Sequence, residues 1–213
     1  MTQPMNRNAK IPAIGDVAEE DGEFWVDNPF LMPEKGENLS AFERNRMYLN
    51  HGGETFVEAS ALSAADINSD SRGAMAADFD RDGRPDLLVS SIGGGPLRLF
   101  LNRFDDDNAR VTIELRGTKT NALGIGARVM IECGDQKIFR DMFPANGFMG
   151  MEPTELVIGL GPVEKIDHMN IRWPSGEVSD FHDLPVNKRI TVTEGETLPR
   201  VGPYAPSAET DKP

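Results

Sequence analysis

The sequence predicts an all-β protein, and two observations support that prediction. In the second half of the chain, apolar and polar residues alternate with a period of two, which is typical of strands with one buried face. Val111, Ile113 and Leu115 alternate with polar neighbours in this way. In the first half, an aspartate-rich loop lies between two apolar runs that are too short for helices. The pattern predicts a calcium-binding β-sheet unit followed by an antiparallel β-sandwich or barrel.

The N-terminal part is predicted from turn residues and short apolar runs. Residues 1–37 are polar and irregular and predict an arm. Its apolar segment from Asn28 to Pro33 is interpreted as covering a domain edge, with contact to another subunit as the alternative. A capping box over Ser40 to Glu43 predicts a short helix that ends near Asn45. The strands expected next are Met47–Asn50, Thr55–Glu58, Gly73–Asp78, Leu87–Ser91 and Leu97–Asn102.

The most informative stretch is the loop from Asp78 to Asp86, which contains four aspartates. Two carboxylates about 4 Å apart near a protein surface repel by roughly 4 kcal/mol, so a loop that gathers four needs a cation. The first, third and fifth loop positions carry aspartate, and glycine at the sixth allows a sharp turn. The seventh can offer its backbone carbonyl, and the ninth closes the shell directly or through water. The sequence predicts one structural Ca²⁺ held by Asp78, Asp80, Asp82, Arg84 and Asp86.

This loop departs from the EF-hand, and other interpretations remain open. An EF-hand needs a bidentate glutamate at its twelfth position, which is Val89 here. The alternative to a calcium site is an acidic surface turn without a metal. The segment Asp66–Asp70 is interpreted as a turn that could lend a ligand. Asp105–Asp107 is interpreted as a solvated linker, and whether either segment binds a second ion is left open.

The second half reads as one β domain over residues 109–196, followed by a proline-rich tail over residues 197–213. Turns at Cys133-Gly134-Asp135 and Pro174-Ser175-Gly176 separate its strands. Met169, Ile171 and Trp173 are expected to share one face. The single cysteine, Cys133, cannot form an internal disulfide and is expected to be a buried apolar residue.

Several motifs resemble known families. Arg44–Asn50, Gly52–Phe56 and Ala77–Gly83 resemble an FG-GAP/VCBS repeat, the blade of integrin-type β-propellers, over residues 38–104. The second half resembles an ASPIC/UnbV domain through Leu115–Asn121, Gly124–Val129, Gly159–Gly161, Arg172–Gly176 and Thr191–Gly195. In this order the chain is similar to the C-terminal part of a cartilage-acidic-protein-like protein. The resemblance implies calcium in the aspartate loop, a propeller-blade-like first unit and an extracellular or periplasmic location. Phe148–Met151 departs from the family, which more often has a small, serine-containing segment there.

The sequence shows no constellation that fits catalysis. His51, His168 and His182 are far apart in the sequence and match no zinc spacing. Ser175 lies in a Pro-Ser-Gly turn and not in a nucleophile elbow. Gly124-Ile125-Gly126 is not followed by the helix of a dinucleotide-binding loop. These patterns predict that the protein is not an enzyme.

Charge and composition narrow the partners. The chain has 213 residues and a formal net charge of −13, which disfavours nucleic acid and anionic membranes as partners. No apolar run is long enough for membrane insertion, and Met1 to Lys10 is polar, unlike a secretory signal. The absence of a visible signal is interpreted as removal, fragmentation or transport with a partner.

The predicted function is a non-enzymatic, calcium-stabilised module for extracellular or periplasmic binding or assembly. Its protein contacts, or self-association, are expected along exposed sheet edges. The alternatives are a structural accessory subunit of a larger surface or periplasmic enzyme complex, and a carbohydrate-binding module with a glycan partner.

Overall fold

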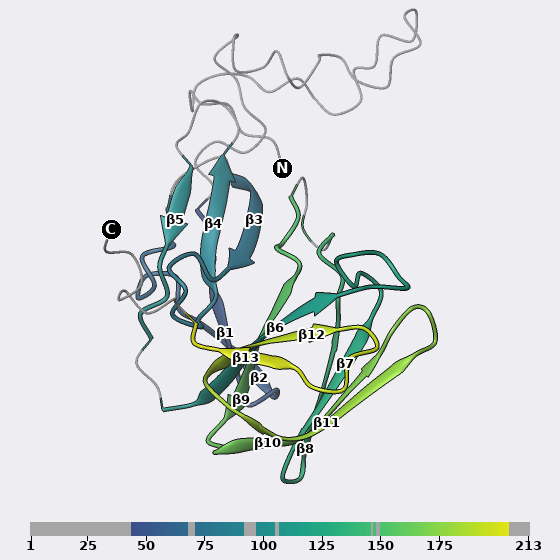
Figure 1. Cartoon of the computed structure of the whole chain (residues 1–213). Coiled ribbons are helices and arrows are strands. Elements are labelled where there is room, and N and C mark those ends of the chain that lie inside the picture. Colours follow the sequence, from purple (N-terminus) through teal and green to yellow (C-terminus); the bar gives the residue numbers. More distant parts are fainter. Residues whose placement is uncertain are drawn as a thin grey trace, which may run out of the picture. The chain divides into compact units, whose positions relative to one another are not determined.

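The computed structural model describes residues 44–67, 71–91, 97–104, 107–145, 147 and 150–204. All regular structure in these residues is β, which confirms the predicted class (Figure 1). The N-terminal arm lies outside the described residues, as does most of the expected helix before Asn45. The last two residues of that expected helix, Arg44 and Asn45, are described and are not helical. No helix in the described part of the chain is long and apolar enough to cross a membrane.

The strands form four sheets. The described strands are β1 (Tyr48–His51), β2 (Thr55–Glu58), β3 (Ser71–Ala77), β4 (Asp86–Ser91), β5 (Arg98–Phe100), β6 (Ala109–Arg116), β7 (Arg128–Cys133), β8 (Gln136–Asp141), β9 (Glu155–Gly161), β10 (Lys165–Arg172), β11 (Val178–Pro185), β12 (Lys188–Thr193) and β13 (Arg200–Gly202). Strands β1 and β2 form a hairpin, and β3, β4 and β5 form a three-stranded sheet in that order. The other two sheets have the orders β11-β10-β7-β8 and β13-β12-β6-β9.

The chain divides into two compact units. The first comprises Met1–Ala74 and Leu88–Phe100, and the second comprises Met75–Leu87 and Leu101–Pro213. The acidic loop between β3 and β4 therefore groups with the C-terminal β domain.

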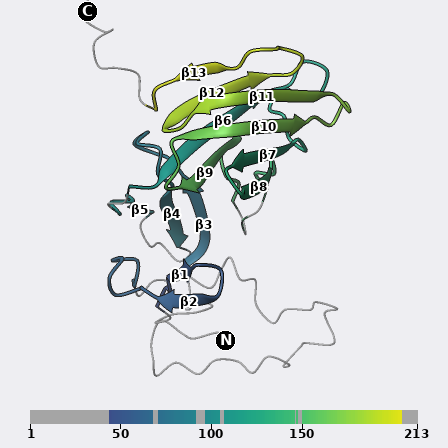
Figure 2. The ribbon, with the colours of Figure 1, turned by 90° about the horizontal axis from the view of Figure 1, so that it is seen from below.

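Figure 2 shows the two four-stranded sheets of the C-terminal β domain. The buried apolar side chains of these sheets form one hydrophobic core. Val111, Ile113 and Leu115 of β6 are buried, as the alternating pattern predicts. Met169 and Ile171 of β10, in the other sheet, are also buried in this core, and so is Cys133. Truncation of such a side chain to alanine typically costs about 2–5 kcal/mol. Because the inner faces of the two sheets are apolar and pack into one core, the alternating strands form a sandwich.

Two features of the domain differ from a simple antiparallel meander. Strand β12 pairs with β6 in parallel, with Ile190 opposite Ile113, while the other pairings in these two sheets are antiparallel. Strand β13 pairs with β12 inside the segment that was expected to be a tail. Prolines at 199 and 203 flank β13, and an edge strand tolerates proline because one row of its N–H groups needs no partner.

The first unit contains an exposed hairpin. Gly52 and Gly53 have positive φ angles of 65° and 81°, which allows the tight reversal between β1 and β2. Asn50 Oδ1 accepts a hydrogen bond of 2.8 Å from the Gly53 backbone N–H. All residues of both strands are exposed. A two-stranded hairpin of this kind is at best marginally stable alone.

Candidate metal centre

The loop between β3 and β4 is folded around the carboxylate of Asp78. Its Oδ1 accepts a hydrogen bond of 3.0 Å from the Asp82 N–H, and its Oδ2 accepts one of 2.9 Å from the Gly83 N–H. Arg81 and Gly83 have positive φ angles of 60° and 84°, so the chain reverses sharply here. The loop therefore turns back on its first aspartate, as the aspartate and glycine spacing predicted.

Three of the four loop aspartates come together. Ligand oxygens of Asp78, Asp80 and Asp86 all lie within 4.8 Å of one another. Asp78 and Asp86 are buried, with exposed fractions of 7% and 1%, whereas Asp80 is exposed. Asp86 accepts backbone hydrogen bonds of 2.9 Å from Phe79 and 2.7 Å from Asn102, which fixes it beside the loop.

The other two expected ligands are placed differently. Asp82 lies outside this group of three and accepts a hydrogen bond of 2.8 Å from the Arg84 backbone N–H. The Arg84 side chain also pairs with Asp82, at 3.1 Å. The contribution of Asp82 and of the Arg84 carbonyl to a metal shell stays a prediction.

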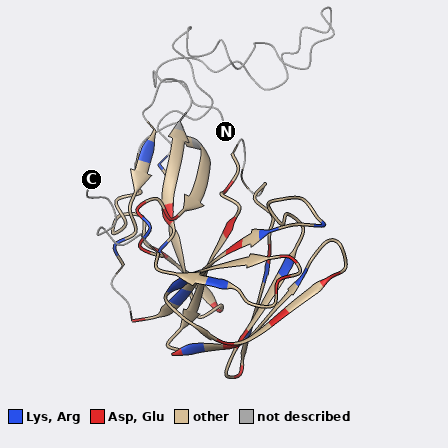
Figure 3. Cartoon of the chain, viewed as in Figure 1, with Lys and Arg blue, Asp and Glu red and all other residues tan. Residues whose placement is uncertain are grey.

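A nearby arginine, which the sequence pattern did not single out, balances part of the negative charge. Arg103 pairs with Asp80 at 2.7 Å and with Asp82 at 3.4 Å. Residues of both charge signs therefore occur in and around this loop (Figure 3). The Arg103 side chain is 59% exposed, so water screens these ion pairs.

The electrostatics of Asp78 favour a cation. Burial is the largest influence on the pKa of Asp78 and raises it, while the N–H groups of Gly83 and Asp82 act in the opposite direction. The charges of Asp82 and Glu155 raise this pKa further. A buried carboxylate in this state is stabilised by a neighbouring positive ion.

The donor set fits a hard cation. All three gathered side chains offer carboxylate oxygen, which is the ligand type of Ca²⁺, and a calcium shell of 6–8 oxygens leaves positions for further chain oxygens or water. The residues present therefore fit calcium, and Asp78, Asp80 and Asp86 are the side chains that would hold it.

The loop packs against a residue near the end of the described chain. A Cβ atom added to Gly83 would lie 2.5 Å from the ring of Tyr204. The Tyr204 hydroxyl donates a hydrogen bond of 2.9 Å to the Arg110 carbonyl of β6. Burial raises the pKa of Tyr204 to about 12. Only glycine at position 83 therefore permits both the turn and this packing.

A second polar cluster lies inside the β domain. The buried Glu194 accepts hydrogen bonds of 2.9, 2.7 and 3.0 Å from the N–H groups of Thr118, Lys119 and Thr120. The Ser175 hydroxyl donates to the same carboxylate, at 2.5 Å. Burial opposes ionisation, but these hydrogen bonds outweigh it and lower the pKa of Glu194 to about 2. Residues from three separate sequence motifs thus meet in one hydrogen-bonded cluster, which accounts for their polar residue types.

Two histidines that are far apart in the sequence lie close together in the structure. His168 and His182 lie opposite each other on β10 and β11, and their rings stack at 4.6 Å. Hydrogen bonds to Asp180 and then Glu132 raise the pKa of His168. The separation in the sequence concealed this pair because a hairpin brings residues on either side of its turn together.

Of the remaining acidic segments, only Asp66 and Asp107 are described at their acidic positions. Asp66 pairs with Arg44 at 2.6 Å within the first unit. The other aspartates of these two segments, and residues 148–149 of the divergent loop, lie outside the described residues.

The described residues form an all-β chain with an acidic loop between β3 and β4 and a C-terminal β-sandwich. Family models identify the two parts: residues 38–89 match the FG-GAP-like repeat, and residues 117–199 match the ASPIC and UnbV domain. The chain therefore contains an FG-GAP-like repeat followed by an ASPIC and UnbV domain.

Comparison with other proteins gave two further findings. No curated protein matches the chain. Among solved structures, the chain is similar to a candidate cell adhesion protein from Bacteroides ovatus, with 11% identity, coverage of 76% of this chain and 97% of the other, and a TM-score of 0.33.

Proposed function

We propose that the protein is a non-enzymatic, calcium-stabilised extracellular or periplasmic module that assembles with other protein chains. The observation that carries the assembly part is the hairpin of β1 and β2. Its large side chains Tyr48, Phe56 and Val57 are exposed, Phe56 by 70%. Each strand of the hairpin has one edge without a partner strand among the described residues. Exposed apolar side chains on an open edge are typical of interaction surfaces.

The calcium part rests on the geometry of the β3–β4 loop. Asp78 and Asp86 are fixed by backbone donors at the two ends of the loop, and Asp80 lies with them. A cation bound there would fix the connection between two neighbouring strands of one sheet. Its role is structural, because its ligands come from one loop and serve to hold that loop.

Thermal unfolding tests the calcium site. Calcium at about 100 times its Kd should stabilise the folded protein by about 2.7 kcal/mol and raise Tm by about 5–10 °C relative to chelator. Magnesium should raise Tm by less, because it demands tighter octahedral geometry. Asp78→Asn should abolish the calcium response, and Asp135→Asn, in the exposed turn between β7 and β8, should retain it. An unchanged Tm in chelator would refute the site.

Sedimentation tests the assembly surface. We expect the wild-type chain to self-associate with rising concentration, or to bind a discrete partner from its native source. Phe56→Ser should weaken that association, while Phe139→Ser, at another exposed aromatic on β8, should leave it unchanged. A wild-type chain that stays monomeric and binds no partner would contradict the proposal. Equal effects of the two substitutions would exclude the hairpin as the assembly surface.

The same experiment separates the proposal from its alternative. An accessory subunit should co-purify with one larger protein at fixed stoichiometry, whereas an assembly module should associate with copies of itself or with several surface proteins.

A further inference from the structure

The outer face of the sheet β11-β10-β7-β8 carries a cluster of histidine and carboxylate side chains that the proposed function does not use. Strand register places Glu132 of β7, His168 of β10 and His182 of β11 in one cross-strand row. Asp180 is two residues from His182 on β11, so both side chains point to the same face. The row lies outside the core because Met169 and Phe181, next to these residues, point inward.

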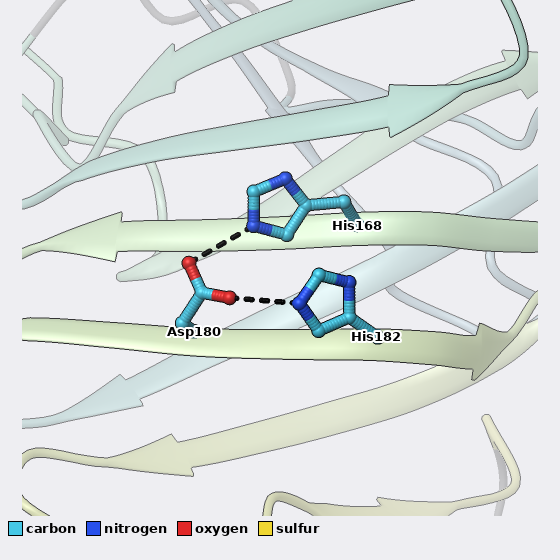
Figure 4. Close-up of side chains that lie close together, drawn as sticks. All are labelled: His168, Asp180 and His182. Carbon is cyan, nitrogen blue, oxygen red and sulfur yellow. Dashed lines mark hydrogen bonds and ion pairs between the residues drawn. The ribbon is translucent and has the colours of Figure 1, made fainter.

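Figure 4 shows that His168 and His182 both turn toward the carboxylate of Asp180. His168 Nε2 lies 2.9 Å from Asp180 Oδ2, and His182 Nε2 lies 3.0 Å from Asp180 Oδ1. One ligand atom from each of the three residues falls within a group no wider than 4.8 Å. Two imidazole nitrogens and a carboxylate oxygen thus converge from neighbouring strands.

We propose that His168, Asp180 and His182 form a binding site for a transition-metal ion of the Zn²⁺ class. Imidazole nitrogen with carboxylate oxygen is a ligand set that Zn²⁺ accepts and that Ca²⁺ does not favour. Three protein ligands leave a fourth position for water or for a group from another molecule. The site goes beyond the proposed function and does not depend on it.

Neighbouring side chains already orient the ligands. Glu132 lies 3.0 Å from His168 Nδ1, which leaves Nε2 directed at Asp180. Lys137 pairs with Glu132 at 2.5 Å and holds it in place. Asn170 donates a hydrogen bond of 2.9 Å to Asp180 Oδ2. A carboxylate on the second nitrogen of a ligand histidine is a recurrent support of metal sites, because it fixes the ring and its tautomer.

A small side-chain movement completes the geometry. Ligand atoms around a tetrahedral zinc with bonds of about 2.0–2.1 Å lie roughly 3.4 Å apart, and the three ligand atoms here all lie within 4.8 Å of one another. His182 is 65% exposed and can rotate out of its stack on His168. The metal then replaces the protons that the two rings share with Asp180.

Titration calorimetry with ZnCl₂ tests the site in the full chain, with Co²⁺ absorption as a second readout. We expect one saturable site per chain and a tetrahedral Co²⁺ spectrum. His168→Gln and His182→Gln should each weaken zinc binding at least about tenfold, and Glu132→Gln should weaken it by about tenfold through loss of orientation.

His51→Gln is the matched control, because His51 is the chain's third histidine and lies on the exposed strand β1. It should bind zinc like the wild type. Circular dichroism should show all variants folded. Three results would each overturn the proposal: a lack of saturable zinc binding, an octahedral Co²⁺ spectrum, or equal losses of affinity in His51→Gln and His182→Gln. The cluster would then be an ion-pair network only.

Discussion

Two buried carboxylates in the same compact unit have opposite pKa shifts. Glu194 accepts hydrogen bonds from three successive N–H groups and from hydroxyl groups, and its pKa falls to about 2. Asp78 accepts only two N–H groups, with Asp82 and Glu155 nearby, and its pKa rises because it is buried. The difference shows that donor count and like charge decide whether a buried carboxylate is stabilised by the chain or needs a cation.

Removing the well-satisfied carboxylate should have the largest effect. Glu194→Ala leaves the N–H groups of Thr118, Lys119 and Thr120 without their acceptor inside the fold. We expect Tm to fall on the order of 10 °C, whatever the calcium concentration. The control is Glu196→Ala, at an exposed position two residues away. A fall that calcium reverses would mean that the two carboxylates are not independent.

The turn of the acidic loop should be the next most sensitive position. Gly83→Ala adds backbone strain at φ 84° and a clash with Tyr204, and we expect a loss of about 2–3 kcal/mol. Gly134→Ala has φ 55° and no atom within 4 Å of the new Cβ, so it should cost only about 1 kcal/mol. Equal losses in chemical denaturation would show that Tyr204 does not restrict the loop.

Acid should reduce the contribution of Glu194 to the stability of the fold. Because the folded pKa of Glu194 is about 2, below its ordinary value of 4.5, its contribution is complete above that value. The contribution is lost as pH falls toward 2. We expect the difference in denaturation midpoint between wild type and Glu194→Gln to shrink over this range. Lys119 and Glu177, which pair beside the cluster, are present in both proteins. A constant difference would refute the assigned pKa.

The smallest effect should come from the arginine beside the acidic loop. Arg103→Gln removes an exposed partner of Asp80 and Asp82, so Tm without calcium should fall by only about 1–3 °C. The rise on adding calcium should become larger, because no guanidinium competes with the ion. Arg128→Gln, which removes an exposed pair with Asp141, is the control and should leave the calcium response unchanged. A reduced response in Arg103→Gln would show that Arg103 supports the ion.

The sequence patterns predicted the class and much of the core. The alternation in β6 and β10 predicted which side chains are buried, since a strand with one apolar face can only turn that face inward. The spacing of aspartates with Gly83 predicted a sharp loop that gathers carboxylates, although Asp82 turned to Arg84. The partners Arg103, Asn102 and Tyr204 were not predicted, because nothing local to the loop specifies them.

The histidine cluster had a signal that hairpin geometry could have revealed. His168 and His182 stand seven residues before and seven after Ser175, in the turn that joins β10 to β11. Counting outward from the turn pairs them directly. The third strand in the row, β7, could not be found this way, because it pairs with β10 across a long sequence separation.

By itself the sequence determined the β class, the acidic loop and its oxygen chemistry, because alternation and turn geometry act between near neighbours in the chain. The tertiary structure alone decided the parallel pairing of β12 with β6, the position of Tyr204 over Gly83 and the meeting of Glu194 with residues 118–120. These contacts join residues far apart in the sequence, and their partners are selected by packing in the complete fold.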